Sequence, residues 1–173
     1  MKKQLYAYDF DNTLVSYDSF RRYLWHLMTI MPCAMMRLLI RRRLRLISGA
    51  ELKAQVTKMV SKSELLAKDA KCFANRIAKD VEIPQITPQD ATILLISASP
   101  DIYMQHIAKV LNCDVLCSKF IGTDYMEMYG DEKTKNLHQY YPETSYEYTY
   151  AASDSESDLC WMREFSKYEL VKQ

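Results

Sequence analysis

The run from Ala91 to Pro100, ATILLISASP, is the feature of this sequence that most limits the fold. It is a continuous apolar run of strand length that ends in small polar residues. Because polar and apolar residues do not alternate in it, we expect a strand that is buried on both faces. Such strands are typical of parallel sheets with helices on both sides. The run therefore predicts an α/β fold.

Strand-like and helix-like segments alternate around this run. Four further segments have the composition of strands: residues 4–10, 113–118, 146–153 and 167–172. Helices are predicted between them at residues 101–112, 131–141 and 157–165. This alternation is the pattern of an open parallel α/β sheet.

The block from residue 16 to residue 89 has a different character. It is rich in Leu, Met, Lys, Arg and Ala, and its apolar residues recur at helical spacing. Amphipathic helices are predicted at residues 51–60 and 64–81, the second with Ser63 as its N-cap. Two prolines within residues 83–90 end the block. We therefore expect one α/β domain that carries a helical insertion.

Composition and charge argue against several classes of protein. The net charge of +1 gives no strong bulk attraction to nucleic acid. The five cysteines are scattered and complete no zinc-site pattern, which favours reduced thiols in the cytoplasm. The longest uncharged run, Tyr23–Met36, is shorter than the roughly 20 residues of a membrane-spanning helix and contains Pro32. An acid as early as Asp9 does not fit a signal peptide. A cytoplasmic protein is predicted.

Chemically active side chains follow three of the predicted strands. Asp9 lies at the end of the first strand and Asp11 just after it, Ser97 lies in the long apolar run, and Asp154 and Asp158 follow the fourth strand. In open parallel sheets, ligands bind at the carboxyl ends of the strands. We therefore expect these side chains to converge on one site.

Each feature alone also has an ordinary interpretation. Acids at a strand end can form a solvated turn, a serine there can cap a helix, and Lys133, at the start of a predicted helix, can be solvated. An EF-hand calcium loop needs Gly at its sixth position and Glu at its twelfth. Those positions hold Leu14 and Phe20 in the first loop, and Leu159 and Phe165 in the last. Both calcium loops are therefore excluded.

Taken together, the features resemble the four signature motifs of the haloacid dehalogenase-like superfamily. The matching segments are DFDNTL at residues 9–14, Ser97, Lys133, and SDSESD at residues 153–158. The chain is most similar to the phosphoserine phosphatase-like branch, subfamily IB, in which a helical cap follows the first motif. The resemblance extends over nearly the whole chain.

This resemblance implies a fold and a division of the chain. The expected core is a three-layer, Rossmann-like α/β sheet formed by residues 1–15 and 90–173. The expected cap is all-helical and formed by residues 16–89. In this branch the cap selects the substrate, while the core handles the phosphate.

The resemblance also implies a Mg²⁺-dependent phosphatase that hydrolyses a phosphate monoester through an aspartyl-phosphate. Asp9 would be the nucleophile and Asp11 the general acid and base. Ser97 and Lys133 would contact the transferring phosphoryl group. The implied metal site comprises Asp9, Asp11 through its backbone carbonyl, Asp154 and Asp158. The implied substrate contacts are Thr13, Asp18, Ser97 and Lys133.

A divalent cation would also relieve repulsion among the carboxylates. Two unit charges 4 Å apart repel by about 4 kcal/mol at an effective dielectric constant near 20. Asp9 and Asp11 are two residues apart, so both side chains leave the strand on the same side. Mg²⁺ suits carboxylate, carbonyl and phosphate oxygens. Mg²⁺ is therefore the expected cofactor.

Departures from the branch pattern bear on the substrate. Ser153 stands where the fourth motif commonly has glycine, and Ser97 is followed by Ala98 and Ser99 rather than by two glycines. No cap residue matches the arginine that grips the carboxylate of phosphoserine, although Asp18 falls at the position of the acid near its amino group. These departures argue against phosphoserine itself, and a small soluble phosphorylated metabolite is the expected substrate.

The segment from Tyr23 to Gly49 allows two interpretations. Its apolar part is followed by five arginines within Arg37–Arg45. We favour core helices with a solvated basic face. The alternative is a cap that makes peripheral contact with an anionic bilayer. Phosphatidylglycerophosphate phosphatases of this branch share such a layout, so the alternative substrate is a lipid phosphate. A phosphotransferase or a phosphate-binding module is a further alternative to a hydrolase.

Overall fold

A six-stranded sheet forms the centre of the protein. The computed structural model describes residues 2–171, so Lys172 of the last predicted strand lies outside them. The strands lie in the order β4-β3-β2-β1-β5-β6. Their bounds are β1 Lys3–Tyr8, β2 Thr92–Pro100, β3 Asp114–Ile121, β4 Asp124–Met126, β5 Tyr146–Ser153 and β6 Lys167–Leu170. All neighbours are parallel except β3 and β4, which are antiparallel.

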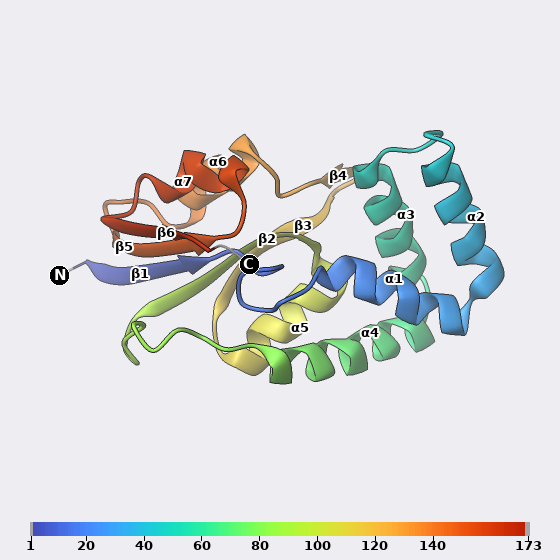
Figure 1. Ribbon diagram of the computed structural model, residues 1–173, viewed down its shortest axis with the longest axis horizontal. Helices are drawn as coiled ribbons and strands as arrows, with labels where there is room; N and C mark the ends of the chain where they lie inside the picture. The colour runs from blue at the N-terminus through green and yellow to red at the C-terminus, as the bar shows by residue number, and fades with distance from the viewer. Residues whose placement is uncertain (1, 172–173) are drawn as a thin grey trace.

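Helices cover both faces of this sheet (Figure 1). On one side lies α5 (Asp101–Leu111), and on the other lie α6 (Asp131–Tyr140) and α7 (Leu159–Met162). Alternate residues of β1 enter different hydrophobic clusters: Tyr6 and Tyr8 one, Leu5 and Ala7 the other. A strand that is apolar on both faces needs such cover on each side. The predicted three-layer α/β fold is confirmed.

Between β1 and β2 the described elements are all helices. They are α1 Ser19–Ile30, α2 Pro32–Arg43, α3 Gly49–Ser61, α4 Glu64–Ile77 and a 3₁₀ turn at Ala78–Asp80. Ser63 caps α4 as predicted, because its Oγ accepts a hydrogen bond from the backbone N–H of Leu66. Ser48 caps α3 in a reciprocal capping box with Glu51.

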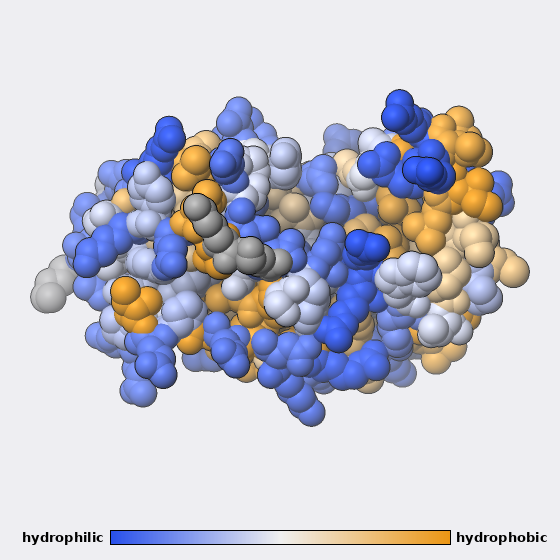
Figure 2. Space-filling model, viewed as in Figure 1, coloured by the Kyte–Doolittle hydropathy of each residue, from blue (hydrophilic) through white to orange (hydrophobic). Residues whose placement is uncertain are grey.

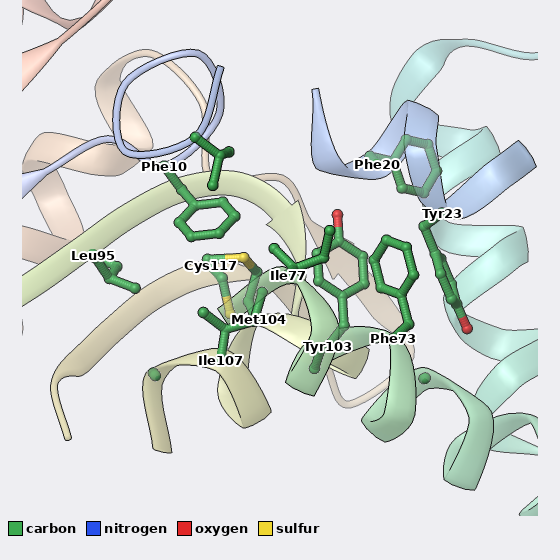
Figure 3. Packing of buried hydrophobic residues seen from close by; sticks show 14 of the residues in the cluster. Phe10, Phe20, Tyr23, Phe73, Ile77, Leu95, Tyr103, Met104, Ile107 and Cys117 are labelled. Carbon is green, nitrogen blue, oxygen red and sulfur yellow. The ribbon is translucent and has the colours of Figure 1, made fainter. Parts of the chain in front are cut away.

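The inserted helices share a hydrophobic core with one face of the sheet. Tyr23 of α1, Phe73 of α4 and Tyr103 of α5 pack against one another in this core (Figure 3). The ring centroid of Phe73 lies 4.8 Å from that of Tyr23 and 5.5 Å from that of Tyr103. Aromatic pairs at such distances add to the energy of burial. The insertion is therefore attached to the core by packing as well as by the chain.

Two details differ from the sequence-based prediction. Strand β4 was not predicted, because three residues are too few to show a pattern; it closes a tight hairpin in which Gly122 has a φ of +61°. Residues 157–165 were predicted as one helix. They instead begin within a 3₁₀ turn, Glu156–Asp158, and continue as the single helical turn α7. The last predicted strand, residues 167–172, corresponds to β6, which lies at one edge of the sheet.

Truncation of Phe73 tests whether the insertion and the sheet form one core. Phe73 is 4 % exposed, whereas Leu65 on the same helix is 79 % exposed. We expect Phe73→Ala to lower the free energy of unfolding by about 3–5 kcal/mol, because it leaves a cavity in the shared core. Leu65→Ala should change it by less than about 0.5 kcal/mol. Urea unfolding of both variants makes the measurement, and equal values would contradict the shared core.

Candidate active site

A cleft lies at the carboxyl ends of β1, β2 and β5. The central strand β1 has β2 on one side and β5 on the other, so the direction of the chain crossovers changes there. Ligands of open α/β sheets bind at this kind of position. The cleft is lined by Asp9, Asp11, Asn12, Asp18, Phe20, Lys53, Ala98, Ser99, Tyr129, Lys133, Asp154, Ser155, Ser157 and Asp158.

A buried lysine joins two of the predicted aspartates. Lys133, at the start of α6, places its Nζ 2.7 Å from Oδ1 of Asp9 and 2.6 Å from Oδ2 of Asp158. The exposed fractions are 3 % for Lys133, 7 % for Asp9 and 1 % for Asp158. The same Oδ2 of Asp158 also accepts a hydrogen bond from Oγ of Ser153 at 2.7 Å. Three chain segments thus meet at one ammonium group.

Ser153, the residue in place of the usual glycine, contributes to this arrangement. Its Oγ donates to Asp158 and accepts from the backbone N–H of Ser155 at 3.1 Å. Its φ is not positive, so the position does not require glycine. The departure in the fourth motif therefore adds two hydrogen bonds without backbone strain.

The charges in this group shift one another's pKa. Burial raises the pKa of Asp9 to about 7; Lys133 opposes the shift and Asp158 adds to it. Burial lowers the pKa of Lys133, but the two carboxylates outweigh burial, and its pKa is raised overall. A further cation beside Asp9 would favour its ionised form and lower its pKa. Lys133 alone therefore does not offset the effect of burial on the pKa of Asp9.

Asp11 is held by both of its carboxylate oxygens. Oδ1 accepts from the backbone N–H of Ser19, the first residue of α1, at 2.6 Å. Oδ2 accepts from Oγ of Ser99 at 2.6 Å and from Oγ of Ser97 at 3.4 Å. Burial raises the pKa of Asp11, while the bonds from Ser19 and Ser99 lower it. A raised pKa suits a carboxyl group that must carry a proton during turnover.

Ser97 and Ser99 both lie beside Asp11 at the end of β2. Ser97, the predicted phosphate contact, is 1 % exposed, and its Oγ donates to Asp11 and accepts from the backbone N–H of Ser99. Ser99 lines the cleft. Ser99 could have been predicted as a site residue, because it lies two residues beyond Ser97 on the same strand and its side chain therefore leaves the strand on the same side.

The remaining predicted residues lie around this centre. Asp154 lines the cleft, and its backbone N–H donates to Oγ1 of Thr13 at 3.0 Å. Thr13 thus ties the first loop to the loop after β5. Asp18 lines the cleft and caps α1 through a 2.7 Å bond from the backbone N–H of Arg21. The fold therefore brings all eight predicted site residues to one region.

Lys53 is a cleft residue that the sequence did not reveal. It comes from α3, and its Nζ donates to the carbonyl oxygen of Ala98 at 2.9 Å and to Oε1 of Glu127 at 2.7 Å. Phe20 of α1 lines the cleft beside it, with its ring centroid 6.0 Å from the Nζ. Among 23 lysines and arginines, nothing in the local sequence marks this one. Lys53 reaches the cleft only because α3 packs over the end of β2.

The cleft offers oxygen ligands for a cation. Five aspartates and two lysines line it, so negative charge is in excess. Among residues 2–171, no group of three or more His, Cys, Asp and Glu side chains is arranged to hold a metal ion. Mg²⁺ commonly binds through only one or two carboxylates, together with water and substrate phosphate. Asp9 and Asp154 fit this kind of site.

Comparisons with known proteins agree with the fold. The family described as haloacid dehalogenase-like hydrolase matches residues 7–163. No curated protein matched the sequence. A protein of unknown function from Bordetella pertussis Tohama I is similar in structure, with 13 % identity and a TM-score of 0.64 over 99 % of this chain and 100 % of that one.

Two further solved structures carry more specific names. A HAD family hydrolase from Salmonella enterica subsp. enterica serovar Typhi has 14 % identity and a TM-score of 0.56, over 95 % of this chain and 61 % of that one. A phosphoserine phosphatase, solved as a phospho-aspartyl intermediate analogue, has 13 % identity and a TM-score of 0.51, over 99 % of this chain and 95 % of that one. These likenesses are in the fold, and the family match spans most of the chain. The chain belongs to the haloacid dehalogenase-like hydrolase family.

Proposed function

We propose that this protein is a Mg²⁺-dependent phosphatase that hydrolyses a small phosphate monoester through an aspartyl-phosphate on Asp9. The observation that carries the proposal is the buried group of Asp9, Lys133 and Asp158 beside Asp11, at the carboxyl end of the central strand. A phosphoserine phosphatase with a similar fold has been captured as a phospho-aspartyl intermediate analogue, which supports the same chemistry.

The reaction would proceed in two displacements at phosphorus. In the first, a carboxylate oxygen of Asp9 bonds to phosphorus, the bond to the ester oxygen breaks, and Asp11 gives its proton to that oxygen. In the second, Asp11 takes a proton from water as the water oxygen bonds to phosphorus and the bond to Asp9 breaks. Bound Mg²⁺, held by Asp9, Asp154 and the carbonyl of Asp11, would offset the charge of the phosphate.

Lys133 and Asp158 have different tasks in this proposal. Lys133 offsets negative charge on Asp9 and on the transferring group, which is the main requirement of phosphoryl transfer. Asp158 positions Lys133, because its Oδ2 accepts hydrogen bonds from both Lys133 and Ser153. Ser99, which lines the cleft, joins Ser97 as a candidate hydrogen-bond donor to the phosphoryl oxygens.

The acceptor of the phosphoryl group separates hydrolysis from the alternatives. Water as acceptor yields free phosphate, an alcohol yields a new phosphate ester, and a phosphate-binding module yields neither. We propose a small soluble substrate, because Phe20 and Lys53 bring the cap helices onto the cleft. Assays of free phosphate and of phosphorylated acceptor, over a panel of esters that includes a lipid phosphate, distinguish these possibilities.

Replacing Asp9 tests the nucleophile. We expect Asp9→Asn to reduce hydrolysis of p-nitrophenyl phosphate below detection, because an amide oxygen is a poor nucleophile at phosphorus. The circular dichroism spectrum should stay unchanged, since the size of the side chain is kept. Asp124→Asn, at an exposed carboxylate of β4, is the matched control and should keep full activity. Near-normal turnover by Asp9→Asn would exclude this mechanism.

Replacing Asp11 tests the acid and base. Asp11→Asn should lower hydrolysis of an alkyl phosphate by about a hundredfold or more. The loss in the phosphorylation step should be smaller for an aryl phosphate, because a phenolate leaves more readily without a proton. Pre-steady-state release of the leaving group measures this step. Equal losses for both esters would instead assign Asp11 a structural role.

Thermal stability in the presence of Mg²⁺ tests the metal site without an assay of activity. At a hundredfold excess over its Kd, a ligand stabilises the folded state enough to raise Tm by roughly 5–10 °C in a protein of this size. We expect this rise in the wild type, in Asp11→Asn and in Asp124→Asn, but a much smaller rise in Asp154→Asn. An undiminished rise in Asp154→Asn would remove Asp154 from the site.

A further inference from the structure

The helix α2 and the loop after it leave apolar side chains exposed on the surface. Four of them form what we call the α2 patch: Met36, Ile40, Leu44 and Leu46, which are 52 %, 50 %, 63 % and 65 % exposed. They line one shallow groove together with Pro32, Cys33, Arg37 and Arg41. Figure 2 shows apolar surface over α2, beside hydrophilic atoms at one end. In α2, only Met35 is fully buried.

Backbone hydrogen bonds fix the loop that carries Leu44 and Leu46 after α2. The backbone N–H of Leu46 donates to the carbonyl of Arg41 at 2.9 Å, and that of Arg45 to the carbonyl of Arg42 at 3.1 Å. This bond pair is the Schellman motif, with Arg45 in the left-handed region at a φ of +58°. The apolar contact that usually accompanies the motif would bury Leu46. Here Leu46 is exposed beside Ile40 instead.

The charge around the patch is positive. From Ser19 to Ala50 the sequence has no Asp or Glu, and it has seven arginines. The salt bridges of residues 2–171 do not involve Arg37, Arg41, Arg42, Arg43 or Arg45. A second groove across α2 is lined by four cations and no acid: Arg37, Arg41, Lys58 and Lys62. An anionic surface would be attracted to these guanidinium and ammonium groups.

We propose that the α2 patch binds the surface of an anionic lipid bilayer. The apolar side chains of the patch would enter the boundary between headgroups and acyl chains, and the arginines and lysines beside them would contact lipid phosphates. A bilayer supplies both environments along one plane, matching an apolar groove with a cationic groove next to it. The proposed contact is peripheral. Among residues 2–171 no helix has the length and apolarity of a membrane span. The favoured sequence interpretation, core helices with a solvated basic face, did not foresee that apolar side chains of this segment are exposed as well.

Vesicle flotation tests this proposal and needs no substrate, so its result is independent of the phosphatase proposal. The wild type should float with vesicles of phosphatidylcholine and phosphatidylglycerol, and much less with phosphatidylcholine alone. Arg37→Gln/Arg42→Gln/Arg43→Gln should weaken binding to the anionic vesicles by roughly a hundredfold, because three cations near the surface are lost. Leu44→Ser/Leu46→Ser should weaken it by about tenfold or more.

A matched variant distinguishes a local surface from overall charge. Lys68→Gln/Lys71→Gln/Lys109→Gln removes three exposed cations from α4 and α5 and should bind as the wild type does. Equal, weak binding of all proteins to both kinds of vesicle would overturn the proposal. So would equal weakening by the two cation variants. The other possible occupant of the patch is a second copy of this chain, and sedimentation velocity without lipid tests it. If the wild type is a dimer that Leu44→Ser/Leu46→Ser dissociates, the patch is a contact between two copies and the proposal is overturned.

Discussion

The buried ion triad of Asp9, Lys133 and Asp158 is the interaction on which the site depends. Removing three charged groups from water is costly, and only mutual pairing makes their burial tolerable. Lys133 reaches Asp9 at the end of β1 and Asp158 beyond the end of β5. The bond fixes α6 against the centre of the sheet. Two acids and one base leave net negative charge, which is why a cation belongs to the proposed chemistry.

The sequence identified the parts of the site that depend on local pattern. Asp9, Asp11 and Asp154 follow strands whose apolar runs are visible in the sequence, and parallel strands bring such ends together. Lys53 was missed because its place depends on how α3 packs over β2. The sequence could not show which of Ser97 and Ser99 lines the cleft, because both leave β2 on the same side. Only the tertiary structure shows that it is Ser99.

The helical insertion likewise combines predictable and unpredictable features. Its helices and the Ser63 cap follow from apolar spacing and capping chemistry. The attachment of the insertion through Tyr23, Phe73 and Tyr103 could not be predicted, because aromatic residues at helical spacing can pack against any apolar neighbour. The same pattern made α2 resemble a core helix. Periodicity shows that a helix has an apolar face, but not whether protein covers that face.

The hydrogen bond from the backbone N–H of Ser19 to Asp11 links the inserted helices to the carboxyl group that we propose as the acid and base. Ser19 is the first residue of α1, and its own Oγ also bonds to Ser99 and Tyr103. The bond to Asp11 lowers the pKa of that carboxyl. A tilt of α1 that broke it would make Asp11 retain its proton more firmly, and the return of α1 would release that proton more readily. The position of α1 would thus help to set the acidity of Asp11.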